Sequence, residues 1–79
     1  MYVNTEYYRD KTILVTGGTG SIGSQIVRNL VKCKPKAVRV FDINETGLFD
    51  LEQEINDSCL RPLVGDIRDK DRLRRATEG

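Results

Sequence analysis

Residues 12–23 of the chain read Thr-Ile-Leu-Val-Thr-Gly-Gly-Thr-Gly-Ser-Ile-Gly, an apolar run followed by a glycine-rich turn. The β-branched run is typical of a buried strand. After the turn, Ile22, Ile26 and Leu30 recur at helical spacing. A strand, a glycine-rich turn and a helix in this order predict a dinucleotide-binding site, because small residues let backbone N–H groups at the helix start approach a pyrophosphate.

The glycine-rich turn fits two patterns that indicate the same ligand. Residues 18–23 satisfy G-x-G-x-x-G, and residues 16–23 satisfy T-G-x-x-G-x-x-G. Asp42 provides an independent check, because a dinucleotide site needs an acidic residue about 20 positions further on, after the second strand. It lies 19 residues after Gly23 and directly follows the apolar run 37–41. The spacing therefore supports a dinucleotide as the ligand.

A P-loop for nucleoside triphosphates is the main alternative for such a turn. It requires G-x-x-x-x-G-K-[ST], and its lysine reaches the outer phosphates. Counted from Gly18, the second glycine is Gly23, but Ser24 and Gln25 occupy the lysine and hydroxyl positions. The sequence therefore argues against nucleotide hydrolysis. A turn that is rich in glycine by chance is also disfavoured, since strand, helix and acidic residue fall in register.

The composition limits the classes of protein to which the chain can belong. Its 79 residues suffice for one small domain, and 13 basic against 12 acidic residues give no positive field for nucleic acid. We expect a cytosolic protein without a membrane partner, because the sequence has neither a long apolar run nor a signal-peptide pattern. Cys33 and Cys59 lack metal-ligand spacing and histidine is absent, so we expect reduced cysteines, no metal site and no histidine-based catalysis.

Apolar periodicity predicts three strands that alternate with three helices. The expected strands are 12–16, 37–41 and 60–64, and Pro62 places the third on the outside of the sheet. The expected helices are 21–32, a second that Asn44 caps and residues 56–58 end, and a third from Asp69 through Ala76. Residues 1–10 would form a lead-in segment, in which a short helix packs on something outside the chain. Residues 11–79 would then be the N-terminal part of a dinucleotide-binding domain.

Right-handed crossovers between parallel strands predict a three-layer α/β fold with the strand order 3-2-1. This is one half of a doubly wound, Rossmann-type domain, so we interpret the chain as a truncated fold. The strand at 12–16 would then have a bare edge. A buried-type strand with a bare edge is prone to pair with a second copy or with a partner chain.

Four segments carry a resemblance to a known family. They are residues 11–24, Phe-Asp-Ile-Asn-Glu at 41–45, Leu-Glu-Gln-Glu-Ile at 51–55 and Gly-Asp-Ile-Arg-Asp at 65–69. The chain resembles the extended short-chain dehydrogenase/reductases over most of residues 11–76. Within them it is most similar to the nucleotide-sugar dehydratases and epimerases of polysaccharide biosynthesis, of the UDP-N-acetylglucosamine 4,6-dehydratase type. The glycine motif alone indicates the superfamily, and the other three segments indicate the branch.

The resemblance implies a role for each part of the site. The backbone of the turn would hold the pyrophosphate, Asp42 would bind the adenosine ribose, and Asp66 would bind the adenine amino group beneath Ile67. The residues implied to bind the cofactor are Gly17, Gly18, Thr19, Gly20, Ser21, Ile22, Gly23, Asp42, Ile43, Asn44, Asp66 and Ile67. Alternatively, both aspartates are turn residues after strands and Ile67 is a core residue. The spacing favours the functional role, more strongly for Asp42 than for Asp66.

Asp42 also bears on the choice of cofactor. A carboxylate there accepts hydrogen bonds from ribose hydroxyls and repels a 2′-phosphate, whereas NADP sites place an arginine nearby. Arg39 lies three residues earlier, on the opposite face of the strand. We therefore expect NAD, and NADP stays open because relatives differ.

The catalytic pair of the similar enzymes has no counterpart at its expected place. Those enzymes use Tyr-x-x-x-Lys with a nearby Ser or Thr. Tyr7 and Lys11 have this spacing but precede the first strand. We therefore predict no catalytic residue, and we expect the cofactor-binding N-terminal piece of such an enzyme, inactive by itself. The alternatives are a free-standing nucleotide-binding or oligomerising module and a degraded gene product.

Overall fold

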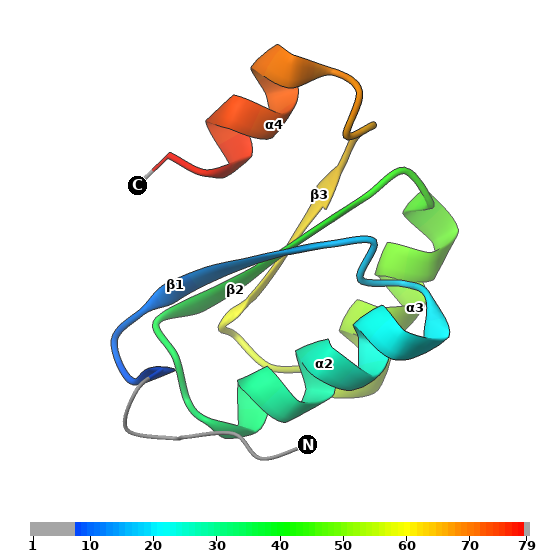
Figure 1. Ribbon diagram of the computed structural model, residues 1–79. Helices are drawn as coiled ribbons and strands as arrows, with labels where there is room; N and C mark the ends of the chain where they lie inside the picture. Colours follow the sequence, from blue (N-terminus) through cyan, green and yellow to red (C-terminus); the bar gives the residue numbers. More distant parts are fainter. Residues whose placement is uncertain (1–7, 79) are drawn as a thin grey trace.

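The computed structural model describes residues 8–78, which form three parallel strands and three helices (Figure 1). The elements are β1 (Thr12–Thr16), α2 (Ser21–Lys32), β2 (Ala37–Asp42), α3 (Glu45–Ile55), β3 (Leu60–Val64) and α4 (Lys70–Ala76). The predicted alternation of strands and helices is confirmed. Only β2 is longer than expected, because Asp42 still pairs with Val64 in the sheet.

Local sequence sets the ends of the helices. The side chain of Asn44 accepts a hydrogen bond from the Gly47 amide at 2.9 Å, and this caps α3. Asp69 caps α4 in the same way through the Arg72 amide at 3.1 Å. Asn56 ends α3 in the left-handed conformation with φ 48°, which asparagine tolerates better than most residues. Both predicted caps are therefore confirmed.

The sheet has the predicted order, with β2 between β1 and β3. Thr12 of β1 pairs with Ala37, and Val38 of β2 pairs with Leu60 of β3. Pro62 lies opposite Val40 on the outer strand β3, as its missing N–H group predicted. Within residues 8–78, β1 pairs with β2 alone, so its other edge is open.

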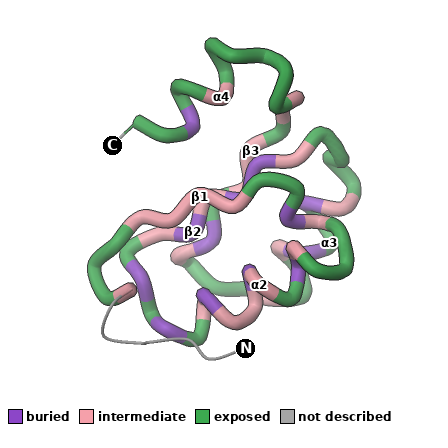
Figure 2. Tube along the Cα trace, viewed as in Figure 1, coloured by how far each residue is buried: buried purple, intermediate pink, exposed green. Residues whose placement is uncertain are grey.

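Helices α2 and α3 cover one face of the sheet, and α4 lies on the other (Figure 1). The hydrophobic core lies between the sheet and the pair α2 and α3, where the buried positions concentrate (Figure 2). Its buried members are Val27, Leu30, Val38, Val40, Leu48, Leu51 and Leu60. Alternation along β2 points Val38 and Val40 into this core and Arg39 and Phe41 toward α4.

Helix α4 is held mainly by hydrogen bonds to main-chain carbonyls. The Arg72 Nε donates to the Val64 carbonyl at 2.5 Å, and the Arg39 guanidinium donates to the Ala76 carbonyl at 3.1 Å. Ala76 is the one buried residue of α4. Because few apolar contacts fix it, α4 is the element of the described fold that we expect to open first.

The structure describes only the end of the lead-in segment, residues 8–10. Tyr8 packs against the core of this chain. Its carbonyl accepts a hydrogen bond from the Lys11 amide at 3.1 Å, which turns the chain into β1. Residues 1–7, and with them Tyr7 of the Tyr-x-x-x-Lys spacing, lie outside the described residues.

Candidate functional site

The ends of all three strands meet at the carboxyl edge of the sheet. The segments that follow β1, β2 and β3 surround a hollow of about 400 Å³. It is lined by Thr16, Gly17, Phe41, Asp42, Ile43, Gly65, Asp66 and Ile67. The structure thus brings together residues that the sequence implicated from three separate segments. In open α/β sheets, ligands bind in the crevice at this edge.

Three glycines of the turn are required by the fold itself, through the backbone conformation or through close packing. Gly17 has φ +67°, a conformation that side chains disfavour. A Cβ at Gly23 would lie 2.3 Å from the Gly17 carbonyl oxygen, and a Cβ at Gly18 would lie 2.3 Å from Cγ1 of Val40. Gly23 therefore allows α2 to start close against the turn, and Gly18 lies buried on the core.

Gly20 is different, because nothing in the described protein demands a glycine there. Its φ is −68°, and a Cβ would meet only the Gly17 carbonyl oxygen, at the ordinary contact distance of 3.7 Å. The space in front of Gly20 is therefore open. A position that lacks a side chain without an internal reason is one at which a ligand can approach the backbone.

The N-terminus of α2 is open to an anion. Gly20 offers no side-chain cap, and the first turn contains no acidic residue. Ser21 and Ile22 are exposed there, Ile22 at 78% of its surface. Since the first N–H groups of a helix have no partner within the helix and carry its positive dipole end, they favour a negative group such as a pyrophosphate.

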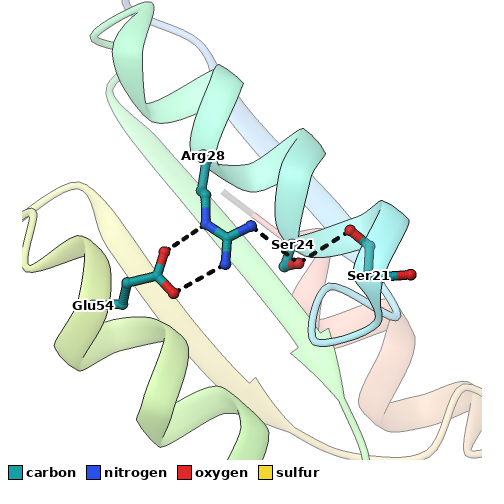
Figure 3. A network of polar contacts seen from close by, with 4 residues as sticks. All are labelled: Ser21, Ser24, Arg28 and Glu54. Carbon is teal, nitrogen blue, oxygen red and sulfur yellow. Dashed lines mark hydrogen bonds and ion pairs between the residues drawn. The ribbon is translucent and has the colours of Figure 1, made fainter.

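A polar network runs from the first turn of α2 to Arg28, which ties the second half of this helix to α3 (Figure 3). The Arg28 guanidinium forms two hydrogen bonds with the Glu54 carboxylate, at 2.5 and 2.9 Å, and also reaches Ser24 Oγ at 3.4 Å. Ser24 Oγ in turn donates to the Ser21 carbonyl at 3.2 Å. The hydrogen bond from Arg28 lowers the pKa of Glu54.

Asp42 is the central acceptor of the site. Its Oδ2 accepts from the Thr19 amide at 3.0 Å and from Thr19 Oγ1 at 2.7 Å, and its Oδ1 accepts from the Asn44 amide at 3.0 Å. Partial burial alone would raise the pKa of Asp42. The hydrogen bonds from Thr19 and Asn44 outweigh burial and lower the pKa of Asp42 below its ordinary value. Asp42 therefore stays ionised and ties the glycine-rich turn to the start of α3.

Asp66 is held by a neighbour that sequence reasoning missed. Both of its carboxylate oxygens accept from the Arg68 side chain, at 2.6 to 3.1 Å, and the Arg68 amide adds a bond at 2.8 Å. These bonds lower the pKa of Asp66 to about 2. The signal was the arginine two residues after the aspartate, a spacing at which the side chain can fold back. Asp66 faces the hollow with its carboxylate already paired.

Two isoleucines leave apolar surface at the hollow. Ile43 is 65% exposed and Ile67 is 58% exposed, and both line it. Their exposure contradicts the alternative that Ile67 is a core residue. Exposed apolar side chains beside polar groups are the surface that a flat, aromatic ring can cover. Asn44 is another of the implicated residues. Its side chain caps α3 by accepting from the Gly47 amide.

A larger hollow, of about 650 Å³, lies on the other face of the sheet beneath α4. Its lining includes none of the residues that the sequence implicated. Arg39, Arg61 and Arg72 line it, and each donates to a main-chain carbonyl. These arginines therefore have structural roles, and we place the candidate site at the smaller hollow.

Residues 8–78 contain no group of three side chains that could hold a metal ion and no helix long and apolar enough to cross a membrane. Cys33 and Cys59 are both free. Burial, together with the hydrogen bond that the thiol donates to the Asp57 carboxylate, raises the pKa of the Cys59 thiol to about 11, so this thiol is poorly reactive at neutral pH.

Comparisons with known proteins identify similar chains. The profile of a family described as "Polysaccharide biosynthesis protein" matches residues 13–79. An uncharacterized membrane protein of Methanocaldococcus jannaschii is 62% identical over 94% of this chain and 22% of its own length. UDP-N-acetylglucosamine 4,6-dehydratase (inverting) of Campylobacter jejuni is 37% identical over 84% of this chain and 20% of its own length. The chain thus spans about one fifth of these relatives.

Two solved structures share the fold. Pen from Bacillus thuringiensis superposes with a TM-score of 0.85 at 46% identity, over 91% of this chain and 22% of that protein. An oxidoreductase of the short-chain dehydrogenase/reductase family from Burkholderia thailandensis superposes with a TM-score of 0.77 at 28% identity, over 85% of this chain and 26% of that protein. The family resemblance and the Rossmann-type fold inferred from the sequence are both confirmed.

Proposed function

The chain belongs to the polysaccharide biosynthesis protein family, and from this premise we propose that it binds the adenosine and pyrophosphate parts of NAD. One observation carries the proposal. The ends of three strands converge on one hollow beside an uncapped helix N-terminus, where Gly20 has no side chain although the protein leaves room for one. The residues present thus fit a dinucleotide.

Each part of the ligand has a matching surface. The pyrophosphate would meet the N–H groups at the start of α2 in front of Gly20, where no carboxylate opposes it. The adenosine ribose would donate to Asp42, and the adenine ring would lie between Ile43 and Ile67. The amino group of adenine would donate to Asp66 in place of one of the Arg68 bonds, because each carboxylate oxygen of Asp66 already accepts two hydrogen bonds from Arg68.

The cofactor that we propose is NAD. The ionised carboxylate of Asp42 would repel a 2′-phosphate, and Glu45 adds a second negative charge in the first turn of α3. Arg39 is committed to the carbonyl of Ala76 on the far face. Among the described residues, the hydrogen-bond donors to the Asp42 side chain are Thr19 and Asn44, and none is an arginine.

For the whole protein we propose a nucleotide-sugar dehydratase or epimerase, on the basis of the dehydratase among its relatives. When bound, the nicotinamide would supply a hydride acceptor for the sugar ring. The described residues would hold the other half of the cofactor, and we assign none of them to catalysis. A cytosolic setting remains our prediction, to be tested by cell fractionation.

The test is an amide NMR titration of the 79-residue chain with NAD⁺. We expect saturable shifts at Gly17 to Gly23, at Asp42 and at Asp66, and weaker effects with NADP⁺. A well-dispersed spectrum that does not respond to NAD⁺ would contradict the proposal.

Gly20→Ala provides the matched variant for this titration. A Cβ at this position meets no close protein atom, so we expect the free energy of unfolding to change by only about 0.5 kcal/mol. NAD⁺ binding should nevertheless weaken by about tenfold or more, because the methyl group occupies the approach to the α2 amides. Normal binding by this variant would place the pyrophosphate elsewhere.

The open edge of β1 favours a second candidate function, that of a module which pairs with a second copy or a partner chain. Its test is sedimentation of the chain over a range of concentrations. Self-association that Leu14→Lys leaves unchanged would not involve the β1 edge; Leu14 lies on the face of β1 opposite the core, in register with Arg39. A monomer at all concentrations would count against pairing with a second copy.

A further inference from the structure

The carboxylate of Asp42 has few acceptor positions left for a ligand. Its Oδ2 accepts two hydrogen bonds from Thr19, at 3.0 Å from the amide and at 2.7 Å from Oγ1. Its Oδ1 accepts one bond from the Asn44 amide at 3.0 Å. Because each carboxylate oxygen offers two lone-pair positions, Oδ2 is saturated and Oδ1 keeps at most one free position.

The adenosine ribose carries two hydroxyl donors, one more than Asp42 can accept in this arrangement. Thr19 Oγ1 is the acceptor that adjoins it. A hydroxyl has a single proton and two lone pairs, so Thr19 can donate to Oδ2 and still accept a bond from a ligand. We propose that the two ribose hydroxyls are divided, one donating to Asp42 Oδ1 and the other to Thr19 Oγ1. This inference rests on the proposed function.

Packing holds Thr19 in the required position. A Cβ at Gly47 would lie 2.8 Å from the Cβ of Thr19, so α3 lies directly against this side chain. On its other side, the bonds to Asp42 fix the hydroxyl. Thr19 is thus a specificity-determining residue: a 2′-phosphate has no hydroxyl proton to donate at that position and brings charge next to Asp42.

A rival arrangement makes the opposite prediction. If the ribose displaced the Thr19 hydroxyl and took both carboxylate oxygens, removal of that hydroxyl would leave binding unchanged or tighten it, because Oδ2 would be freed. In the divided arrangement, its removal takes away one of the two acceptors. Thr19→Val separates the two cases, since valine keeps the branched shape that packs on α3.

The experiment is an NMR titration of the 79-residue chain with ADP, 2′-deoxy-ADP and 3′-deoxy-ADP. We expect Thr19→Val to weaken ADP binding by about 3- to 10-fold, the effect of one neutral hydrogen bond, and Thr19→Ser to change it by less than about twofold. One deoxy analogue should bind more weakly than ADP to the wild-type chain but as well as ADP to Thr19→Val. Thr19→Ala replaces Thr19→Val if the valine variant loses its dispersed spectrum.

Two results would overturn the inference while the proposed function stands. One is ADP binding by Thr19→Val as tight as that of the wild-type chain. The other is an equal loss for both deoxy analogues in the wild type and in Thr19→Val. If ADP produces no saturable shift in the wild-type chain, the proposed function fails and the inference fails with it.

Discussion

The N-termini of α2 and α3 lie at the same edge of the sheet but are built in opposite ways. At α3, the Asn44 side chain accepts from the Gly47 amide, and Glu45 places a negative charge in the first turn. At α2, Gly20 provides no side-chain cap and the first turn has no acid. One helix start is thus closed by the protein's own side chains, and the other is open.

This difference separates a helix start that the protein caps itself from one that we propose to bind the ligand. A side-chain cap contributes about 1 kcal/mol to a helix, and α2 forgoes this contribution. Its stability comes from its buried face, which includes Val27 and Leu30, and from the ion pair between Arg28 and Glu54. The amides that would otherwise be capped remain available to a ligand. An uncapped helix beside a capped neighbour is therefore informative about function.

Gly23→Ala should break the α2 start most severely. The new Cβ would lie 2.3 Å from the Gly17 carbonyl oxygen, so the turn or the helix must move. We expect a loss of about 1–3 kcal/mol of the unfolding free energy, a large part of the ~3–5 kcal/mol that a core of this size supplies. Urea denaturation followed by circular dichroism measures the loss. A midpoint equal to that of the wild type would mean that the turn is not packed as described.

Asn44→Ala should weaken the closed end by a smaller amount. It removes the cap but keeps the main-chain amide that binds Asp42, so we expect a loss of about 1 kcal/mol. In a chain of this length that corresponds to a fall in Tm of about 4–8 °C. Asn44→Ser, which restores a cap, is the control and should recover most of the loss in a thermal melt.

Gly20→Asp would make the start of α2 resemble that of α3. The new carboxylate can cap α2, and we expect stability to rise by a few tenths of a kcal/mol, about 0.3, while NAD⁺ binding is lost. Gly20→Asn supplies a similar cap without the charge. A comparison of the two variants therefore shows whether binding is lost because the new charge repels the pyrophosphate or because the new side chain fills its site. Retained NAD⁺ binding in Gly20→Asp would show that the anion does not sit at this helix.

Lowering the pH should affect the starts of α2 and α3 differently, and this is the smallest of the expected effects. The hydrogen bonds from Thr19 and from the Asn44 amide hold the pKa of Asp42 below its ordinary value, so their stabilisation is present in full well above the ordinary pKa of an aspartate. It is lost as the pH falls through the lowered pKa of the folded protein. In a pH series of amide spectra, the Thr19 and Asn44 signals should shift together. The Ser21 signal, with no carboxylate beside it, should stay in place.

The sequence predicted the elements well because local rules determine them. The caps Asn44 and Asp69 and the alternation along β2 each depend on near neighbours in the chain. The strand order followed from the handedness of crossovers, which is nearly invariant. Even the placement of Pro62 on an outer strand needed only its missing N–H group.

The details of the site could not be predicted because they depend on where side chains meet in space. The bonds between Thr19 and Asp42 cross 23 positions of sequence and require the turn to lie on α3. Glycine letters alone also do not reveal that Gly20 is free of internal contacts while Gly23 is not. Tyr8 packs on the core although its segment shows no periodicity.

The close approach of Gly18 to Val40 should couple the evolution of these two positions. A Cβ at Gly18 would lie 2.3 Å from Cγ1 of Val40, so one methyl group both fills the core and supports the turn. A lineage can therefore acquire a side chain at position 18 only after position 40 has become smaller. The reverse order would pass through an ancestor with a displaced turn. Substitutions at positions 18 and 40 should therefore be correlated. The size of the core residue Val40 is limited by the turn that packs on it.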